Sequence, residues 1–169
     1  MLAVMIPIYH DICGRGMVME LDFAIDRRGL VPDSHAAVYL QLGNWVRECY
    51  GRPLAMVSGQ GDEYVVTLRA GEHFDRFQLQ ENTLLGQRIR QYTIESQPAA
   101  AAAGTSWKHI VSGQAIGTKR IILLPGPAVT VASGGLRVRL RVVRSVAKPI
   151  LRFFGVFQPC FPNATMSYK

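Results

Sequence analysis

Residues 19–58 form the one stretch of this 169-residue chain in which strand, helix and turn signals agree. Polar and apolar side chains alternate from Glu20 to Ile25, which is the pattern of a half-buried strand. In the turn that follows, Asp33 and Ser34 can accept hydrogen bonds from the free N–H groups of a helix's first turn. The pattern therefore predicts a strand, a turn, and a helix that begins near Ser34.

The predicted helix has one apolar face. Its residues recur at helical spacing and are His35, Val38, Leu42, Trp45, Val46 and Cys49. Gly51 suits the residue after a helix, and Pro53 cannot continue one, so the chain turns back into a strand at 54–57. This order predicts a β-α-β unit whose helix packs its apolar face on a sheet.

The segments around this unit are read by the same rules. The apolar start of the chain, residues 1–8, predicts a strand, and residues 54–68 predict an antiparallel hairpin. Residues 81–95 fit a helix or a strand, and we expect a helix followed by a strand. Five strand-like segments separated by Gly and Pro follow, at 107–111, 115–124, 128–132, 136–143 and 150–157.

A low-complexity segment, QPAAAAAGTS, divides the predicted α/β part from the β-rich part. We predict an α+β fold with a ferredoxin-like β-α-β-β half at 1–97 and a β-rich basic half at 107–169. Residues 98–106 are then a linker or an insertion loop.

The charge of the chain is strongly uneven. All twelve acids lie between Asp11 and Glu95 with nine Arg and no Lys, whereas residues 107–169 carry ten Lys or Arg and no acid. A cationic surface gains free energy when it neutralises phosphates and releases their counterions. Nucleic acid is the leading predicted partner; a solvated surface, an acidic protein partner and a packaged genome are the alternatives.

The predicted strand at 136–143 concentrates this charge. Its apolar residues fall on one face, and Arg137, Arg139 and Arg141 fall on the other, about 7 Å apart. Guanidinium groups at this spacing can pair with successive phosphates. The alternative is an edge strand whose arginines prevent aggregation. The nearby Phe153, Phe154 and Phe157 could stack on bases, but we expect them in the core.

Cysteine usage and the N-terminus bear on the compartment. Cys13, Cys49 and Cys160 are odd in number and far apart, which favours buried thiols over a disulfide framework or a zinc site. The chain has no long apolar run and no basic region at its start that would indicate a signal peptide. These observations predict a cytoplasmic protein with no membrane contact, no metal and no cofactor.

A family resemblance follows from two motifs. The run ELDFAID, then LVPDSH opening the helix AAVYLQLGNWV, resembles the start of the ferredoxin-like RAMP proteins of CRISPR systems, above all their repeat-processing endoribonucleases. GDEYVVTLRAGEHF is similar to the following strand and loop, and the basic strands after Gly134-Gly135 resemble the RNA-gripping half. The resemblance covers residues 19–80.

The resemblance implies RNA cleavage without a metal ion, by attack of a 2′-hydroxyl on the adjacent phosphate. Some members only hold the guide RNA, so whether the chain cuts stays open. His35 would be the base, Tyr39 would position the hydroxyl, and His109 would be the acid. A neutral imidazole is favoured at a helix N-terminus. The alternative for His35 is a core or capping side chain.

The predicted function is therefore an RNA-binding protein in a ribonucleoprotein complex with other subunits. Its predicted RNA contacts are Lys108, Lys119, Arg120, Arg137, Arg139, Arg141, Arg144, Lys148 and Arg152. The alternative function is a phage or viral capsid or tail protein whose basic β-rich half is an assembly surface.

Overall fold

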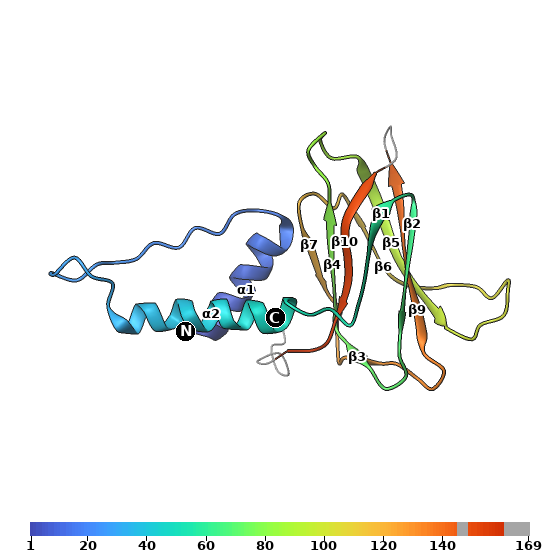
Figure 1. The fold of residues 1–169 in the computed structure, drawn as a ribbon, viewed down its shortest axis with the longest axis horizontal. Coiled ribbons are helices and arrows are strands. Elements are labelled where there is room, and N and C mark those ends of the chain that lie inside the picture. Colours follow the sequence, from blue (N-terminus) through green and yellow to red (C-terminus); the bar gives the residue numbers. More distant parts are fainter. Residues whose placement is uncertain (145–148, 161–169) are drawn as a thin grey trace.

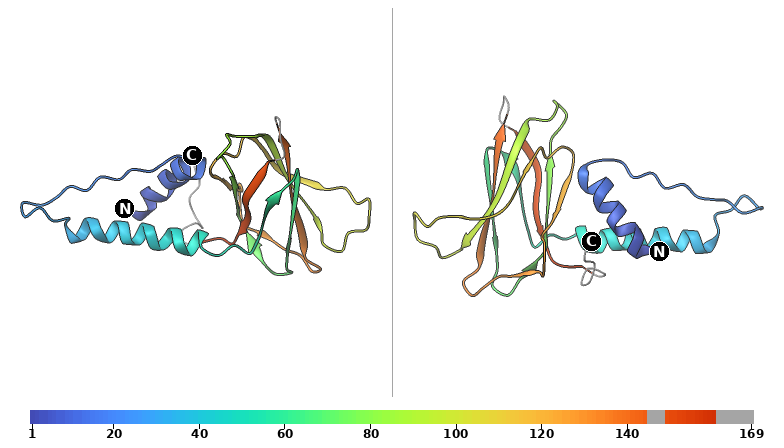
Figure 2. Two further views of the ribbon diagram at one scale, coloured as in Figure 1. Left: turned by 45° about the horizontal axis from the view of Figure 1, so that its top comes forward. Right: turned by 180° about the vertical axis from the view of Figure 1, so that it is seen from behind.

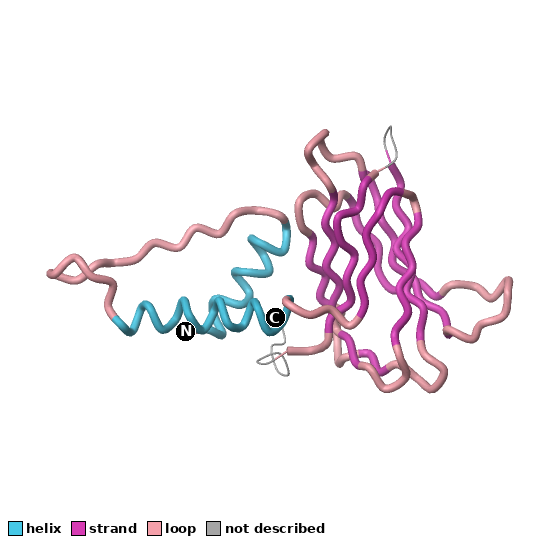
Figure 3. Tube along the Cα trace, in the orientation of Figure 1, coloured by secondary structure: helices cyan, strands magenta, loops and turns pink. Residues whose placement is uncertain are grey.

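The computed structural model describes residues 1–144 and 149–160, which form a helical unit beside a β-sandwich (Figure 1). The helical unit contains α1 (Leu2–Ile12), the short 3₁₀ helix η1 (Cys13–Arg15) and α2 (Asp33–Tyr50). Figure 3 shows that all described helices lie at one end of the molecule and all described strands at the other.

The sandwich consists of two four-stranded sheets in the orders β1-β10-β4-β7 and β2-β9-β5-β6, and a two-stranded sheet of β3 and β8. All these pairings are antiparallel. The strands are β1 (Ala55–Gln60), β2 (Glu63–Leu68), β3 (His73–Phe74), β4 (Arg76–Glu81), β5 (Ile89–Pro98), β6 (Lys108–Gln114), β7 (Arg120–Leu123), β8 (Val129–Thr130), β9 (Leu136–Arg144) and β10 (Ile150–Phe157).

Alternating side chains hold the two large sheets face to face. In β9, Val138, Leu140 and Val142 are buried, and every second residue between them is an arginine that faces outward. Phe154 and Val156 of β10 are buried in the same core. The core therefore lies between the sheets, as in other sandwiches. Of the three phenylalanines expected there, Phe154 and Phe157 are buried and Phe153 is half-buried.

The helix α2 confirms the predicted helix, but its apolar face packs on another helix. Leu42, Trp45 and Cys49 are buried against Ile6 and Tyr9 of α1. The prediction that residues 1–8 form a strand is wrong, because an unbroken apolar run sets no period by itself. Contact with α2 selects the helical form of this segment.

The predicted strand at residues 20–25 does not form. In Figure 2 the connection between α1 and α2 runs away from the sandwich and lies beside no described strand. Phe23 stacks on Tyr39 of α2 at 3.8 Å, and the Tyr39 hydroxyl donates to the Asp22 carbonyl. The alternating pattern is present, but the described chain offers no strand with which this segment could pair.

The predicted hairpin at 54–68 is also wrong. Both strands exist, but β1 pairs with β10 in one sheet and β2 pairs with β9 in the other. The turn Gly61-Asp62 therefore carries the chain from sheet to sheet. Residues 81–95 contain no helix, only a turn before β5.

The ferredoxin-like α+β fold is contradicted, because the described fold is mostly β and has no β-α-β unit. The alanine-rich segment 98–106 connects β5 to β6, which are neighbours in one sheet. Each large sheet takes strands from both sides of this segment. Described strands on both sides of the segment thus share the core between the sheets.

Candidate functional site

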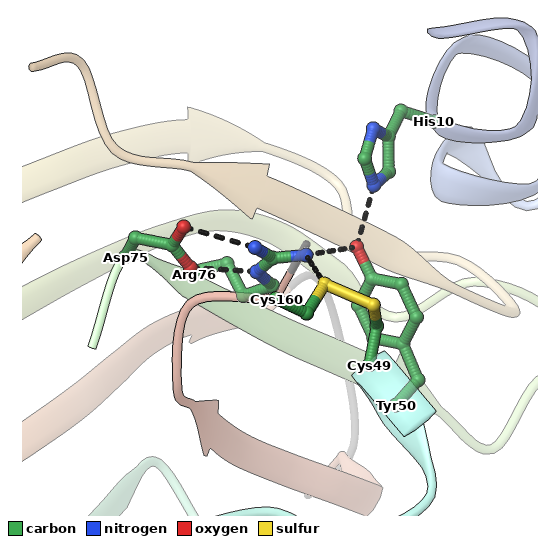
Figure 4. A network of polar contacts seen from close by, with 6 residues as sticks. All are labelled: His10, Cys49, Tyr50, Asp75, Arg76 and Cys160. Carbon is green, nitrogen blue, oxygen red and sulfur yellow. Dashed lines mark hydrogen bonds and ion pairs between the residues drawn. A yellow bond between two sulfur atoms is a disulfide. The ribbon is translucent and has the colours of Figure 1, made fainter. Parts of the chain in front are cut away.

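The densest polar cluster lies where the helical unit meets the sandwich (Figure 4). It brings together His10 from α1, Tyr50 from the end of α2, and Asp75 and Arg76 at the start of β4. Tyr50 also packs edge-on against Phe157 of β10. We call these four polar residues, with the Cys49–Cys160 disulfide, the junction cluster.

Arg76 is the centre of the junction cluster. Its side chain is 0% exposed, and its guanidinium donates to both carboxylate oxygens of Asp75, at 2.6 and 2.9 Å. It also donates to the Tyr50 hydroxyl at 3.4 Å and to the Cys160 sulfur at 3.0 Å. Burial opposes the charge of Arg76, but Asp75 and Tyr50 outweigh burial and raise its pKa. The charge of Arg76 is therefore compensated by groups of the protein and does not face solvent.

His10 and Tyr50 are held in their neutral forms. Burial and the positive charge of Arg76 lower the pKa of His10 from 6.5 to about 4. Burial also raises the pKa of Tyr50 above its usual range. The two side chains are hydrogen-bonded at 2.6 Å, so a Tyr50 hydroxyl that accepts from Arg76 can donate to His10. The cluster is arranged to hold two units together.

The disulfide between Cys49 and Cys160 corrects the prediction of buried thiols. It joins the end of α2 to the chain just after β10 across 111 positions of sequence, while Cys13 stays free. Sequence spacing cannot reveal such a pair, because the fold alone brings the two residues together. Disulfides persist mainly in oxidising compartments, so the predicted cytoplasmic location stays a prediction.

His10 predicts a pH-dependent stability. Its pKa is lower in the folded protein than in the unfolded chain, so the unfolded chain binds more protons between pH 6.5 and about 4. Folding free energy from this group is fully present above pH 6.5 and is lost as the pH falls through about 4. A loss of about 2–3 kcal/mol is expected, from a shift of this size at a partly exposed ring.

Urea denaturation of wild type and His10→Phe at pH 7.0, 5.5 and 4.5 measures this effect. The two proteins differ only at position 10, so the difference between their pH dependences isolates the histidine. His35→Phe is the matched control, because His35 is exposed. Equal pH slopes for wild type and His10→Phe would contradict the assignment.

The three predicted catalytic residues do not meet. His35 and Tyr39 line an apolar pocket of about 310 Å³ on the helical unit, whereas His109 lines a pocket of about 410 Å³ on the sandwich. His109 is hydrogen-bonded to Ser112 at 2.8 Å. A base and an acid on different pockets cannot act on one phosphate.

Two of the three arginines in the predicted row on β9 contact other side chains of this protein. Arg139 pairs with Glu95 at 2.8 Å and with Glu63 at 3.3 Å. Its guanidinium lies 4.1 Å from the ring centre of Trp107, and that of Arg137 lies 5.8 Å away. Arg141 is exposed. The acids of the first half thus neutralise the middle of the row.

The other predicted RNA contacts are scattered over the molecule. Lys119 lies over the Tyr9 ring at the helical unit, Arg144 pairs with Asp62, and Arg152 is exposed on β10. Lys108 lines the 410 Å³ pocket. Arg120 is half-buried on β7, and Lys148 lies outside the described residues. No common surface joins the described members of this set.

The pockets of the described residues contain few groups that could act on a substrate or hold a metal ion. The 310 Å³ pocket contains one acid, Asp22, and neither the 410 Å³ pocket nor a third pocket of about 330 Å³ contains any. Within residues 1–144 and 149–160 no three His, Cys, Asp or Glu side chains are grouped to hold a metal ion. None of the described helices is both long and apolar enough to span a membrane.

Comparison with known proteins identifies a different relationship from the one predicted. The rice (Oryza sativa subsp. japonica) protein "Putative alpha-L-fucosidase 1" is 31% identical over 99 residues, which cover 59% of this chain and 17% of that protein. No protein-family model matches the chain.

Solved structures agree with the rice match. A "putative alpha-L-fucosidase" from Bacteroides thetaiotaomicron VPI-5482 has a TM-score of 0.82 and 26% identity, over 95% of this chain and 34% of that one. A GH29 fucosidase from Ruminococcus gnavus, solved in complex with fucose, has a TM-score of 0.74 and 16% identity, over 95% and 37%. The latter supports the fold alone. This chain spans about a third of the length of these structures.

These likenesses overturn the CRISPR resemblance and what it implied. They point to α-L-fucosidases, which are glycoside hydrolases, and not to RAMP proteins. The predicted RNA partner, ribonucleoprotein complex and endoribonuclease role are therefore wrong, and so is the alternative of a viral structural protein. The short motifs that carried the resemblance, such as LVPDSH, correspond only to a turn and the start of a helix.

Proposed function

We propose that this chain is the sandwich-bearing part of a glycoside hydrolase that acts on α-L-fucosides. The observation that carries the proposal is the structural match to the Bacteroides thetaiotaomicron protein, which extends over both the helical unit and the sandwich. The rice match supports it independently through sequence.

Hydrolysis of a glycosidic bond usually needs two carboxyl groups on either side of the bond, about 5–10 Å apart. Three pockets formed by the described residues contain one acid between them, Asp22. We therefore assign the catalytic carboxylates to a part of the protein outside these residues. In this proposal the chain supports the catalytic part and does not itself cut.

The helical unit is the surface best suited to contact that catalytic part. Ten of the seventeen exposed large apolar side chains of the described residues lie within residues 1–40. They include Val18 at 91% and Ile25 at 66% exposed. Large exposed apolar patches mark protein contacts, and the unpaired alternating segment 20–25 could pair with a strand there.

A chimera tests the proposal. This chain replaces the matching region of the Bacteroides thetaiotaomicron protein, and hydrolysis of 4-nitrophenyl α-L-fucoside is measured beside the parent protein. We expect the chimera to hydrolyse the substrate and the 169-residue chain alone to be inactive. An inactive but folded chimera, or hydrolysis by the chain alone, would contradict the proposal.

Two variants of the chimera test the contact surface. Ile25→Asp should lower the yield of active enzyme more than about tenfold. The new carboxylate would be buried at the contact, and its burial costs more than about 1.4 kcal/mol. Val143→Asp is the matched control, because Val143 is an exposed valine, at 57%, on the sandwich. Equal effects of the two changes would remove the helical unit from the contact.

A further inference from the structure

A polar pocket of about 330 Å³ lies where β5 begins and β6 ends, away from the junction cluster. Its lining residues are Gln87, Ile89, Arg90, Gln91, Gln114 and Ala115. Gln91 and Gln114 are direct partners across the β5–β6 ladder, and cross-strand partners on one face lie close enough for their side chains to act together. The pocket is thus built on two paired strands.

The backbone of this pocket is held in an uncommon conformation. Ala115 has a φ of +46°, and it is the one non-glycine residue with positive φ in the described chain. Its N–H donates to the Arg90 carbonyl at 3.1 Å, which fixes the wall of the pocket. Such strain costs of order 1–3 kcal/mol and is concentrated at ligand sites and turns.

The side chains of the pocket are available for a ligand. Among the described residues, the side chains of Gln87, Gln91 and Gln114 make no hydrogen bond, and all three are exposed. Each amide offers two donors and one acceptor oxygen, and Arg90 adds donors. The site therefore presents donors and acceptors side by side around the small apolar surface of the half-buried Ala115, above the buried Ile89.

The residue types limit which class of ligand this pocket can bind. The pocket has no carboxylate to hold a cation and no aromatic ring on which a flat base could stack. A single guanidinium supplies too little positive charge to bind a polyphosphate. Hydroxyl groups both donate and accept, so a ring that carries several hydroxyls beside a C–H face matches the amides and the apolar surface.

We propose that this pocket binds one monosaccharide unit of a glycan. The inference goes beyond the proposed function, because it concerns binding on the sandwich and needs no hydrolysis. Its site is made by this chain's own residues, and it can hold or fail independently of the fucosidase assignment. A monosaccharide in an open site of this kind should bind with a Kd of about 1–10 mM.

Titration of the ¹⁵N-labelled chain with L-fucose, D-galactose or D-glucose, followed by NMR, tests the proposal. At least one sugar should shift the side-chain amide signals of Gln87, Gln91 and Gln114 with saturation. Ethylene glycol at equal hydroxyl concentration is the solvent control and should not saturate. No saturable shift with any of the three sugars would overturn the proposal.

Variants assign the binding to the pocket. The double change Gln91→Ala and Gln114→Ala should weaken binding more than about tenfold, because it removes two hydrogen-bonding groups. Gln60→Ala is the matched control, because Gln60 is an exposed glutamine at the end of β1 outside the pocket. If the double variant does not fold, Gln87→Ala in the preceding loop replaces it. Unchanged binding in a folded pocket variant would contradict the assignment.

Discussion

Replacing Arg76 by alanine is expected to lower the free energy of unfolding by about 3–5 kcal/mol. Removal of one member of a buried ion pair leaves the other charge without its compensation, and this costs more than the pair contributes. Arg76 is 0% exposed and its guanidinium also contacts Tyr50 and Cys160, so the change affects α2, β4 and the chain after β10 together.

Urea denaturation at pH 7 measures the loss, with thermal unfolding as a second readout. A loss of this size lowers Tm by roughly 10 °C in a chain of this length. Arg152→Ala is the matched control, because Arg152 is an exposed arginine on β10, and its effect should stay within about 0.5 kcal/mol. Similar losses for the two variants would remove Arg76 from its central role.

Removal of the disulfide is expected to have the second large effect. The double change Cys49→Ser and Cys160→Ser should lower the free energy of unfolding by about 2–5 kcal/mol, because the bond closes a loop of 111 positions and limits the unfolded chain. Dithiothreitol should lower the stability of wild type by a similar amount and leave the double variant unchanged.

Cys13→Ser is the control for this experiment, because Cys13 is the free cysteine of the described chain. Combining Arg76→Ala with the double serine variant gives a further test. Arg76 donates to the Cys160 sulfur at 3.0 Å, so the two losses should be non-additive by about 0.5–3 kcal/mol. Strict additivity, or full stability under dithiothreitol, would count against the junction cluster.

Local sequence signals predicted local elements well. The helix at 33–50 has its acidic residue in the first turn and Pro53 shortly after its end, and these signals act within the helix. Residues 136–142 alternate strictly, and they lie in β9 with Val138 and Leu140 buried. Both predictions succeeded because neither depends on a distant part of the chain.

Local sequence signals did not predict which strands pair with each other. β1 and β2 follow each other in sequence as a hairpin would, but their partners, β10 and β9, lie roughly 70 to 100 residues further on. The segment 20–25 has a strand pattern and finds no partner in the described residues. Alternation of polar and apolar residues shows which face of a strand is apolar. It does not show which strand lies beside it.

The candidate site shows the same division. Arg139 is cationic by sequence, but whether it meets phosphate or protein depends on Glu63 and Glu95, far away in the chain. The +10 charge of residues 107–169 therefore did not predict a nucleic-acid surface, because Coulombic pairing depends on distance in space.

The sequence by itself determined where α2 begins and ends, which residues of β9 are buried, and that apolar content suffices for a core. The tertiary structure alone decided which sheet each strand joins, that Cys49 meets Cys160, and that Arg76 is buried between the helical unit and the sandwich. The physical reason is range: helix capping and side-chain alternation act between near neighbours, whereas pairing, disulfide formation and burial of a charge require contacts that the completed fold supplies.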